Sequence, residues 1–336
     1  MGNAPSAYKV IDRSIMLPYY KRFLVEPSLP FIPVKVHPNS ITHTGHLLCF
    51  VSVALLLWAR PERGWLFLAS MLLLQAYLWC DNADGAHARR TRQSSVFGEF
   101  LDHGLDLLNT TYIALLTTAS LGSSPGMVLA LGMVIPGAAA MTCWEQTETG
   151  TFQMGMLNQI ESVMVLSLTM IVSSFFGTEV WRSVHLGPIS AYQFFHYWPI
   201  ATIVFAEARR IWRVYRAGGT VAPAFGYLAF QSAVGVAYLS GFMATHVALS
   251  LAVVATLFLG LRSLSLRLQS LKTRVEPIFV LSTAVVLAYV GARLGGIEVS
   301  QSVGLLLWAA GVAVYALSGL NEARVSVNNL SRIESR

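Results

Sequence analysis

Long apolar runs alternate with short polar loops along most of this chain. A helix needs about 20 apolar residues to cross a bilayer, and ten segments approach that length. They span residues 41–59, 64–82, 98–120, 126–146, 156–176, 191–208, 223–242, 244–264, 276–295 and 301–320. The pattern predicts an all-α polytopic integral membrane protein with about ten transmembrane helices.

The first 35 residues follow a different pattern. Residues 6–35 contain no sustained apolar run, but they mix large apolar and basic side chains: Tyr19, Tyr20, Lys21, Arg22, Phe23 and Leu24. This mixture is typical of an amphipathic helix that lies in the membrane interface. We find no linker or strong repeat, so the chain is predicted to be one integral domain, 1–336. Residues 38–176 would be its catalytic helices, and residues 190–320 a scaffold, a dimer surface or a lipid-entry wall.

Charge supports the membrane topology. Only 12% of the 336 residues are charged and the mean hydropathy is +0.57. With a cytoplasmic N-terminus and ten alternating spans, 19 of the 23 Lys and Arg residues face the cytoplasm, and 4 face the other side. This satisfies the positive-inside rule. The net charge of +6 therefore reflects topology, and no motif indicates a nucleic-acid partner.

The polar residues that interrupt the apolar segments are concentrated between residues 81 and 106. They read D-x2-D-G-x2-A-R-x8-G-x3-D-x3-D. Asp81 and Asp84 end one apolar run, and Asp102 and Asp106 begin the next. Spacings of three and four place each pair on one helix face. A single aspartate at a helix end is normally a cap, but four carboxylates at membrane depth are costly and indicate function.

A turn between these two helices would bring the carboxylate pairs together. The carboxylates would repel one another unless a cation intervened, and all-oxygen ligands favour Mg²⁺, Mn²⁺ or Ca²⁺. Arg89, Arg90 and Arg92 suit phosphate oxygens, and Gly85 and Gly98 would let a nucleotide approach the backbone. The residues therefore predict a metal-dependent phosphate site, with two ions, that faces the cytoplasm.

The same stretch resembles the signature of the CDP-alcohol phosphotransferase family and matches each of its fixed positions. The segment from Pro38 to Thr42 is similar to the one that opens the first span in that family. The runs 97–106 and 144–151 resemble the choline/ethanolamine phosphotransferase branch, which ten spans also suit. One departure is Ala86-His87, where that branch often has Lys-Gln.

This resemblance implies roles for individual residues. Two ions, Mg²⁺ or Mn²⁺, would be held by Asp81, Asp84, Asp102 and Asp106. The CDP-alcohol would be bound by Asn39, Gly85, Ala88, Arg89 and Gly98. The general base would be Asp106, the usual candidate in the family, or His103, which is specific to the branch and has an ordinary pKa of about 6.5 that suits the task better.

Two glutamates allow two interpretations. Glu145 and Glu161 lie in the cytoplasmic halves of the fourth and fifth expected spans. They could attract the ammonium of choline or ethanolamine, with cation–π support from Trp144, Phe152 or Tyr77. Alternatively, Glu145 and its neighbour Glu148 are carboxylates of an interfacial loop.

The resemblance implies transfer of phosphocholine or phosphoethanolamine from the CDP-alcohol to diacylglycerol, with release of CMP. It also suggests a homodimer, in the endoplasmic reticulum or Golgi of a eukaryote or the inner membrane of a bacterium. Alternatives within the enzyme class are a phosphatidyltransferase that uses CDP-diacylglycerol and a small alcohol, and a transferase that uses ceramide. A divalent-cation transporter is disfavoured, because the outer halves of the spans carry no path of carboxylates.

Overall fold

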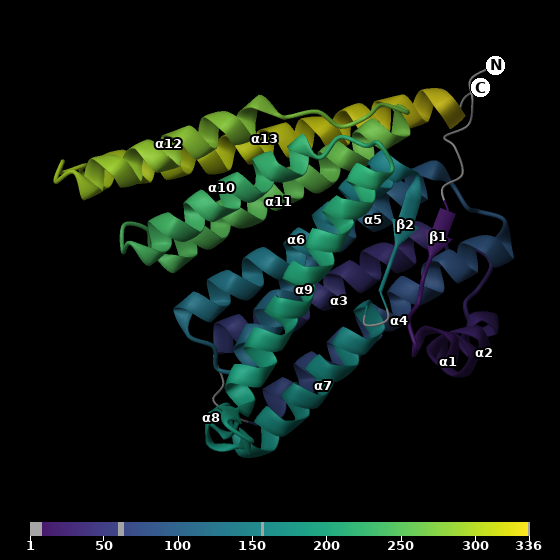
Figure 1. Cartoon of the computed structure of the whole chain (residues 1–336). Helices are drawn as coiled ribbons and strands as arrows, with labels where there is room; N and C mark the ends of the chain where they lie inside the picture. The colour runs from purple at the N-terminus through teal and green to yellow at the C-terminus, as the bar shows by residue number, and fades with distance from the viewer. Residues whose placement is uncertain (1–8, 60–63, 156–157, 335–336) are drawn as a thin grey trace. The chain divides into compact units, whose positions relative to one another are not determined.

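Most of the described residues lie in helices (Figure 1). The structure is a computed structural model that describes residues 9–59, 64–155 and 158–334. Each expected span coincides with one long helix: α3 Pro38–Ala59, α4 Trp65–Thr91, α5 Val96–Ser120, α6 Pro125–Thr149, α7 Gln159–Phe176, α9 Ala191–Arg216, α10 Ala222–Leu239, α11 Thr245–Leu268, α12 Pro277–Leu294 and α13 Gln301–Glu334. The prediction of an all-α fold is confirmed.

Seven helices of the described part are long and apolar enough to cross a membrane: α3, α4, α6, α7, α11, α12 and α13. This supports a polytopic membrane protein, but the count of ten spans is not confirmed. In α5, Glu99, Asp102 and Asp106 interrupt the apolar run, and α9 ends in a basic stretch that begins at Arg209. Helix α10 includes Gln231 and two tyrosines.

Helix α4 is longer than its apolar run. The expected span ended at residue 82, and a turn was expected between the aspartate pairs, but the helix continues to Thr91. Alanine and arginine, which recur between Ala83 and Arg90, are among the strongest helix formers. Hydropathy marks the end of an apolar run, whereas helix propensity decides the end of the helix. The first half of the motif is therefore helical.

The chain divides into two compact units. The motif unit consists of Val10–Met127 and Gln153–Pro199, and the C-terminal unit consists of Met1–Lys9, Val128–Phe152 and Ile200–Arg336. We describe each unit by itself. The description of residues 1–336 as one integral domain stays a prediction.

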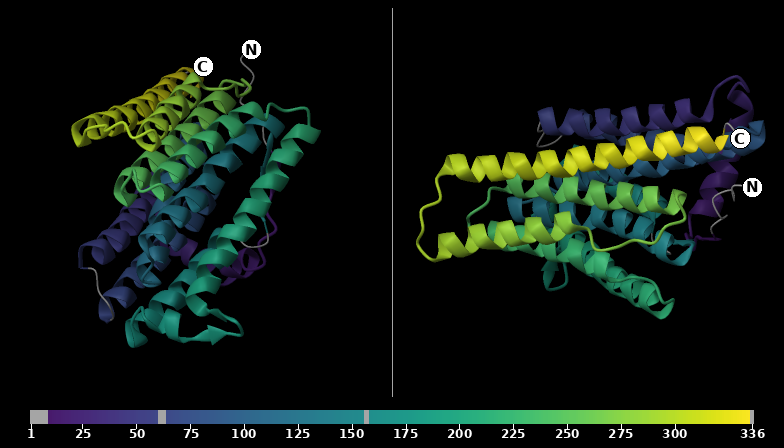
Figure 2. Two further views of the ribbon diagram at one scale, coloured as in Figure 1. Left: turned by 60° about the vertical axis from the view of Figure 1, so that its left-hand side comes forward. Right: turned by 90° about the horizontal axis from the view of Figure 1, so that it is seen from above.

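In the motif unit, α3 packs on both α4 and α5, and α7 packs on the same two helices (Figure 2). The core contains Phe67, Leu74 and Tyr77 of α4, with Met170 of α7. Helices α3 and α4 approach closely at Gly45, where an added Cβ would lie 2.8 Å from the Cβ of Cys80. Small residues at such contacts let transmembrane helices pack tightly.

The N-terminal segment of the motif unit forms a run of short helical turns: α1 Leu17–Tyr20, η1 Lys21–Val25, α2 Glu26–Ser28 and η2 Leu29–Phe31. Tyr20 and Val25 are buried, whereas Tyr19 and Phe23 are exposed. The Arg90 guanidinium at the end of α4 donates to the backbone carbonyls of Leu29 and Ile32. This segment is amphipathic as expected, and its place in the membrane interface stays a prediction.

In the C-terminal unit, α11 packs on α10 and α13, and α10 packs on α12 (Figure 2). Five aromatic rings fill the space between these helices: Tyr227, Phe230, Phe258, Phe279 and Tyr315. Their contacting pairs have centroids between 5.2 and 6.4 Å apart. Aromatic pairs at such distances add to the stability that burial itself gives.

The remaining elements are short. A two-residue hairpin, β3 His185–Leu186 and β4 Ile189–Ser190, follows the single turn α8 Val180–Ser183. Strands β1 Lys9–Ile11 and β2 Thr151–Gln153 form a second two-stranded sheet. These elements connect the long helices, and Trp181 of α8 packs with Leu121 and Ala191 in a small core cluster.

Candidate active site

The aspartate motif occupies the end of α4 and the start of α5. Helix α4 ends at Thr91, and the capping residue Arg92 adopts the left-handed conformation with φ of 57°. Helix α5 begins after Ser95, whose hydroxyl caps it by accepting a hydrogen bond from Gly98 N at 2.9 Å. Because both helices pack on α3, this short connection brings their carboxylates to the same place.

Three of the four aspartates converge. One carboxylate oxygen from each of Asp81, Asp102 and Asp106 lies within 4.8 Å of the other two. Carboxylates so close repel strongly when they are all ionised, unless a cation neutralises them. A donor set made only of oxygens suits a hard divalent cation, so this cluster fits such an ion.

Asp84 is held separately by hydrogen bonds. Its Oδ2 accepts a bond from the Thr42 hydroxyl at 2.5 Å, and its Oδ1 accepts one from Gly85 N at 2.5 Å. Asp84 is buried, with 5% of its surface exposed. The structure thus fixes the orientation of Asp84 beside the cluster without bringing it into the group of three.

Polar side chains of neighbouring helices hold Asp106. Asn109 Nδ2, one turn later on α5, donates to Asp106 Oδ1 at 3.4 Å, and the Tyr77 phenol of α4 also bonds to Asp106. Each of these two groups has a further partner. Gln159 Nε2 donates to Tyr77 Oη at 2.8 Å, and His46 Nδ1 lies 2.9 Å from Asn109 Oδ1. Two chains of hydrogen bonds therefore meet at Asp106.

The residues expected to bind the nucleotide lie at the ends of α3, α4 and α5. Ala88 is buried, whereas Arg89 is exposed. At Gly85, an added Cβ would contact Arg89 Nη1 at 3.4 Å. At Gly98, it would lie 3.2 Å from Asn39 Oδ1. The structure thus pairs Gly85 with Arg89, and Gly98 with Asn39.

His103 lies between the two aspartates of α5. It follows Asp102 directly and precedes Asp106 by three residues, and it is half-buried. It is outside the carboxylate group that Asp81, Asp102 and Asp106 form. Its role as the general base stays a prediction.

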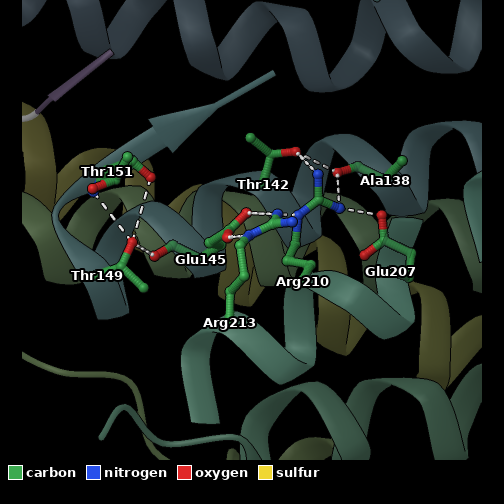
Figure 3. Close-up of polar contacts among 8 residues, drawn as sticks. All are labelled: Ala138, Thr142, Glu145, Thr149, Thr151, Glu207, Arg210 and Arg213. Atoms are coloured by element: carbon green, nitrogen blue, oxygen red, sulfur yellow. Dashed lines mark hydrogen bonds and ion pairs between the residues drawn. The ribbon is translucent and has the colours of Figure 1, made fainter. Parts of the chain in front are cut away.

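Glu145 belongs to the C-terminal unit and lies between two arginines (Figure 3). Its Oε2 accepts a bond from Arg210 Nε at 3.0 Å, and its Oε1 accepts one from Arg213 Nε at 2.6 Å. Arg210 also bonds to Glu207 and to Thr142 Oγ1. Arg210 is itself buried, with 8% of its surface exposed. Both oxygens of Glu145 thus already bind cationic groups.

The neighbouring Glu148 is also buried, with 3% of its surface exposed. Its Oε1 accepts bonds from the backbone N and the hydroxyl of Thr273, at 2.8 and 2.6 Å. Its Oε2 accepts one from Thr220 N at 2.8 Å. Within the C-terminal unit, this carboxylate ties the end of α6 to two loops.

Glu161 lies in the first turn of α7 in the motif unit. It forms a capping box with Asn158, and its Oε1 accepts bonds from the Ser14 hydroxyl at 2.7 Å and from Met16 N at 2.9 Å. Glu161 therefore fastens the N-terminal segment to α7. These contacts do not test its expected role in binding a substrate ammonium, which stays a prediction.

Sequence reasoning did not identify Thr42, His46, Tyr77 and Asn109 as neighbours of the aspartates. Helical spacing contained part of the signal, because Asn109 follows Asp106 by three residues and His46 follows Thr42 by four. The contacts with α3 depend on how α3 is rotated against α4 and α5. Spacing along one helix does not give that rotation.

Comparison with known proteins agrees with this geometry. A model of the CDP-alcohol phosphatidyltransferase family matches residues 35–205, a region that includes all four aspartates of the motif. The resemblance inferred from the motif is therefore confirmed at the level of the family.

Individual relatives match about half of the chain. Cholinephosphotransferase 1 of Danio rerio is 30% identical over 187 residues, which are 52% of this chain and 47% of that protein. Choline/ethanolaminephosphotransferase 1 of Saccharomyces cerevisiae is 25% identical over 184 residues, 52% of this chain and 46% of that protein. CDP-diacylglycerol–serine O-phosphatidyltransferase of Encephalitozoon cuniculi is 32% identical over 181 residues, which are 51% of this chain and 46% of that protein. The chain spans about half the length of these relatives, and it belongs to the CDP-alcohol phosphatidyltransferase family.

Proposed function

We propose that this protein transfers phosphocholine or phosphoethanolamine from a CDP-alcohol to the hydroxyl of diacylglycerol and releases CMP. The oxygen of the acceptor hydroxyl forms a bond to the β-phosphorus, and the bond from that phosphorus to the bridging oxygen of CMP breaks. The hydroxyl proton passes to a general base. The observation that carries this proposal is the convergence of Asp81, Asp102 and Asp106 within 4.8 Å, inside the region that the family model matches.

The aspartates would hold divalent ions, Mg²⁺ or Mn²⁺. Asp81, Asp102 and Asp106 supply the converging oxygens, and Asp84 would join them for a second ion. When bound, such ions neutralise the charge of the pyrophosphate and of the departing CMP. The chemistry of the donor set supports this assignment, because carboxylates are the preferred ligands of hard cations.

The nucleotide would bind beside the cluster. The exposed guanidinium of Arg89 can donate two parallel hydrogen bonds to phosphate oxygens. Gly85 leaves space for a ligand one turn earlier on α4, and Ala88 lies next to Arg89. Asn39, which lies against Gly98, would orient the nucleotide from the start of α3.

The general base would be His103 or Asp106. A carboxylate that binds a cation is a weak base, because the cation stabilises its ionised form. An imidazole with a pKa near 6.5 exchanges protons readily at neutral pH. This argument favours His103, with Asp106 as a ligand that the hydrogen bonds from Asn109 and Tyr77 hold in place.

The site would face the cytoplasm of a multi-pass membrane protein, since the Lys and Arg excess lies on that side. The membrane would be the endoplasmic reticulum or Golgi in a eukaryote and the inner membrane in a bacterium. The homodimer that the resemblance suggests is part of this proposal. Size measurement of the purified protein in nanodiscs tests it.

The proposal is tested by CMP release from the purified full chain in detergent with diacylglycerol. CDP-choline and CDP-ethanolamine are each assayed in the presence of Mg²⁺, Mn²⁺ or EDTA. The variant Asp102→Asn is assayed in the same way as a control. We expect release that needs a divalent ion, prefers one CDP-alcohol and is absent from the variant. No release with either CDP-alcohol would overturn the proposal.

A second candidate is supported by the similarity to the serine O-phosphatidyltransferase of Encephalitozoon cuniculi. In that reaction class, CDP-diacylglycerol would be the donor and a small alcohol the acceptor. The same assay distinguishes the two, with CDP-diacylglycerol and serine or another small alcohol in place of the first pair. Ceramide in place of diacylglycerol tests the remaining alternative for the acceptor.

A further inference from the structure

His46 is an ionisable residue within the first apolar helix. It lies on α3, in the candidate span Pro38–Trp58, and is half-buried. Ionisable side chains in membrane spans are costly, and they normally have a specific partner and a function. The partner here is Asn109, whose Oδ1 lies 2.9 Å from His46 Nδ1.

The hydrogen bonds of Asn109 determine which ring nitrogen of His46 donates to it. Asn109 is only 3% exposed, and its Nδ2 donates to Asp106 Oδ1. Since an ionised carboxylate only accepts hydrogen bonds, the amide nitrogen must face Asp106 and the amide oxygen must face His46. His46 Nδ1 must then carry the hydrogen. The ring of Tyr112, with its centroid 5.6 Å from that of His46, supports the imidazole from the side.

The donor of His46 in turn fixes the orientation of Asn109. If the amide turned over, its oxygen would face the Asp106 carboxylate and that hydrogen bond would be lost, and His46 would keep its bond to Asn109 only by moving its hydrogen from Nδ1 to Nε2. A buried polar group without a partner costs about 1–3 kcal/mol. The chain of bonds from His46 through Asn109 to Asp106 therefore has one stable polarity.

We propose that His46 is a positioning residue that acts through Asn109 to hold the Asp106 carboxylate in the orientation required for binding a divalent cation. This inference rests on the proposed function for its role in turnover, but its effect on cation binding can be measured separately. Groups that orient metal ligands through hydrogen bonds typically contribute 10–100-fold to affinity or activity. His46 itself is outside the carboxylate group formed by Asp81, Asp102 and Asp106.

Two substitutions of similar polarity separate positioning from packing. In His46→Asn, the side-chain amide nitrogen takes the place of Nδ1 and can still donate to Asn109. In His46→Gln, the amide nitrogen corresponds to Nε2 and is displaced from Asn109. Glutamine is closer in volume to histidine, so a packing role would favour Gln, whereas the positioning role favours Asn. His43→Gln, at an exposed position of the same helix, is the matched control.

The experiment measures Mn²⁺ binding by electron paramagnetic resonance, with Mn²⁺ alone and the full chain in nanodiscs, together with the Mn²⁺ dependence of CMP release. For His46→Gln we expect the Mn²⁺ dissociation constant to rise about 10-fold or more. For His46→Asn and His43→Gln, we expect it to stay within about threefold of wild type.

Three results would overturn the inference: unchanged Mn²⁺ binding in His46→Gln, equal loss in both His46 variants, or no Mn²⁺ binding by the wild type. A wild type that binds Mn²⁺ without releasing CMP would refute the proposed reaction alone. In that case, the Mn²⁺ dissociation constants of His46→Gln and His46→Asn would still test this inference.

Discussion

The Thr42 hydroxyl donates to Asp84 Oδ2 at 2.5 Å and thereby connects α3 to the aspartate motif of α4. In Thr42→Val this donor is lost while the shape of the side chain is kept, so the buried Asp84 loses one of its two hydrogen bonds. We expect CMP release to fall by about 10-fold or more and to need more Mg²⁺. Thr42→Ser keeps the hydroxyl and should stay close to wild type. Equal activity of the Val and Ser variants would refute the role of this bond.

The three converging aspartates make a prediction about stability as well as activity. In Asp102→Asn, one of three mutually repelling carboxylates is neutralised. In EDTA we therefore expect this variant to have a higher melting temperature than the wild type. Added Mn²⁺ should raise the melting temperature of the wild type, because it binds only the folded state, and should have little effect on the variant. Melting in nanodiscs, followed by intrinsic fluorescence, measures both effects.

Two glycines of the motif should respond differently to alanine. At Gly85 the added methyl group would have only an ordinary contact, 3.4 Å from Arg89 Nη1. Gly85→Ala should therefore fold normally and raise the KM for the CDP-alcohol, because the methyl group would occupy space for the ligand. At Gly98 the methyl group would lie 3.2 Å from both Asn39 Oδ1 and Ser95 Oγ. Gly98→Ala should therefore also lower the melting temperature. An unchanged KM in Gly85→Ala would refute the expected place of the nucleotide.

The sequence predicted the helices well and their contacts poorly. Long apolar runs are sufficient to locate helices such as α3 and α11, because few other structures bury so many consecutive apolar side chains. The spacing of the aspartates and the expected turn predicted that both carboxylate pairs would meet, and Asp81, Asp102 and Asp106 do converge. The position of Asp84 depends on Thr42 of another helix. Such contacts follow from helix rotation and crossing, which hydropathy does not specify.

The partners of Glu145 show the same limit. Glu145 and Arg210 are separated by 65 residues, and no short-range pattern connects them. The sequence left two interpretations for Glu145, an ammonium site and an interfacial loop. The structure shows it as the centre of a buried ion-pair cluster, and the following prediction decides whether it also contacts the substrate.

Arg210→Met should strongly destabilise the C-terminal unit. The side chains of Arg210 and Glu145 are 9% and 3% exposed, and removing one partner of a buried pair typically costs about 3–5 kcal/mol. Arg216→Met removes an exposed arginine of the same helix and is the matched control. We expect a clear fall in melting temperature for the first variant alone, measured in detergent. Equal melting temperatures would show that the pair contributes little.

Glu145→Gln and Glu161→Gln distinguish structural from substrate roles. Both carboxylates accept at least two hydrogen bonds from this chain, so each variant should be less stable than wild type. A glutamate that also attracts a substrate ammonium should raise the KM for CDP-choline more than the KM for a CDP-alcohol without an ammonium group. From its contacts with two arginines, we expect Glu145→Gln to change both KM values equally. For Glu161→Gln we expect faster proteolysis of the N-terminal segment, because the uncharged amide keeps only one accepting oxygen for the donors of Ser14, Met16 and Asn158. A selective rise in the KM for CDP-choline in either variant would instead assign that glutamate to the head group.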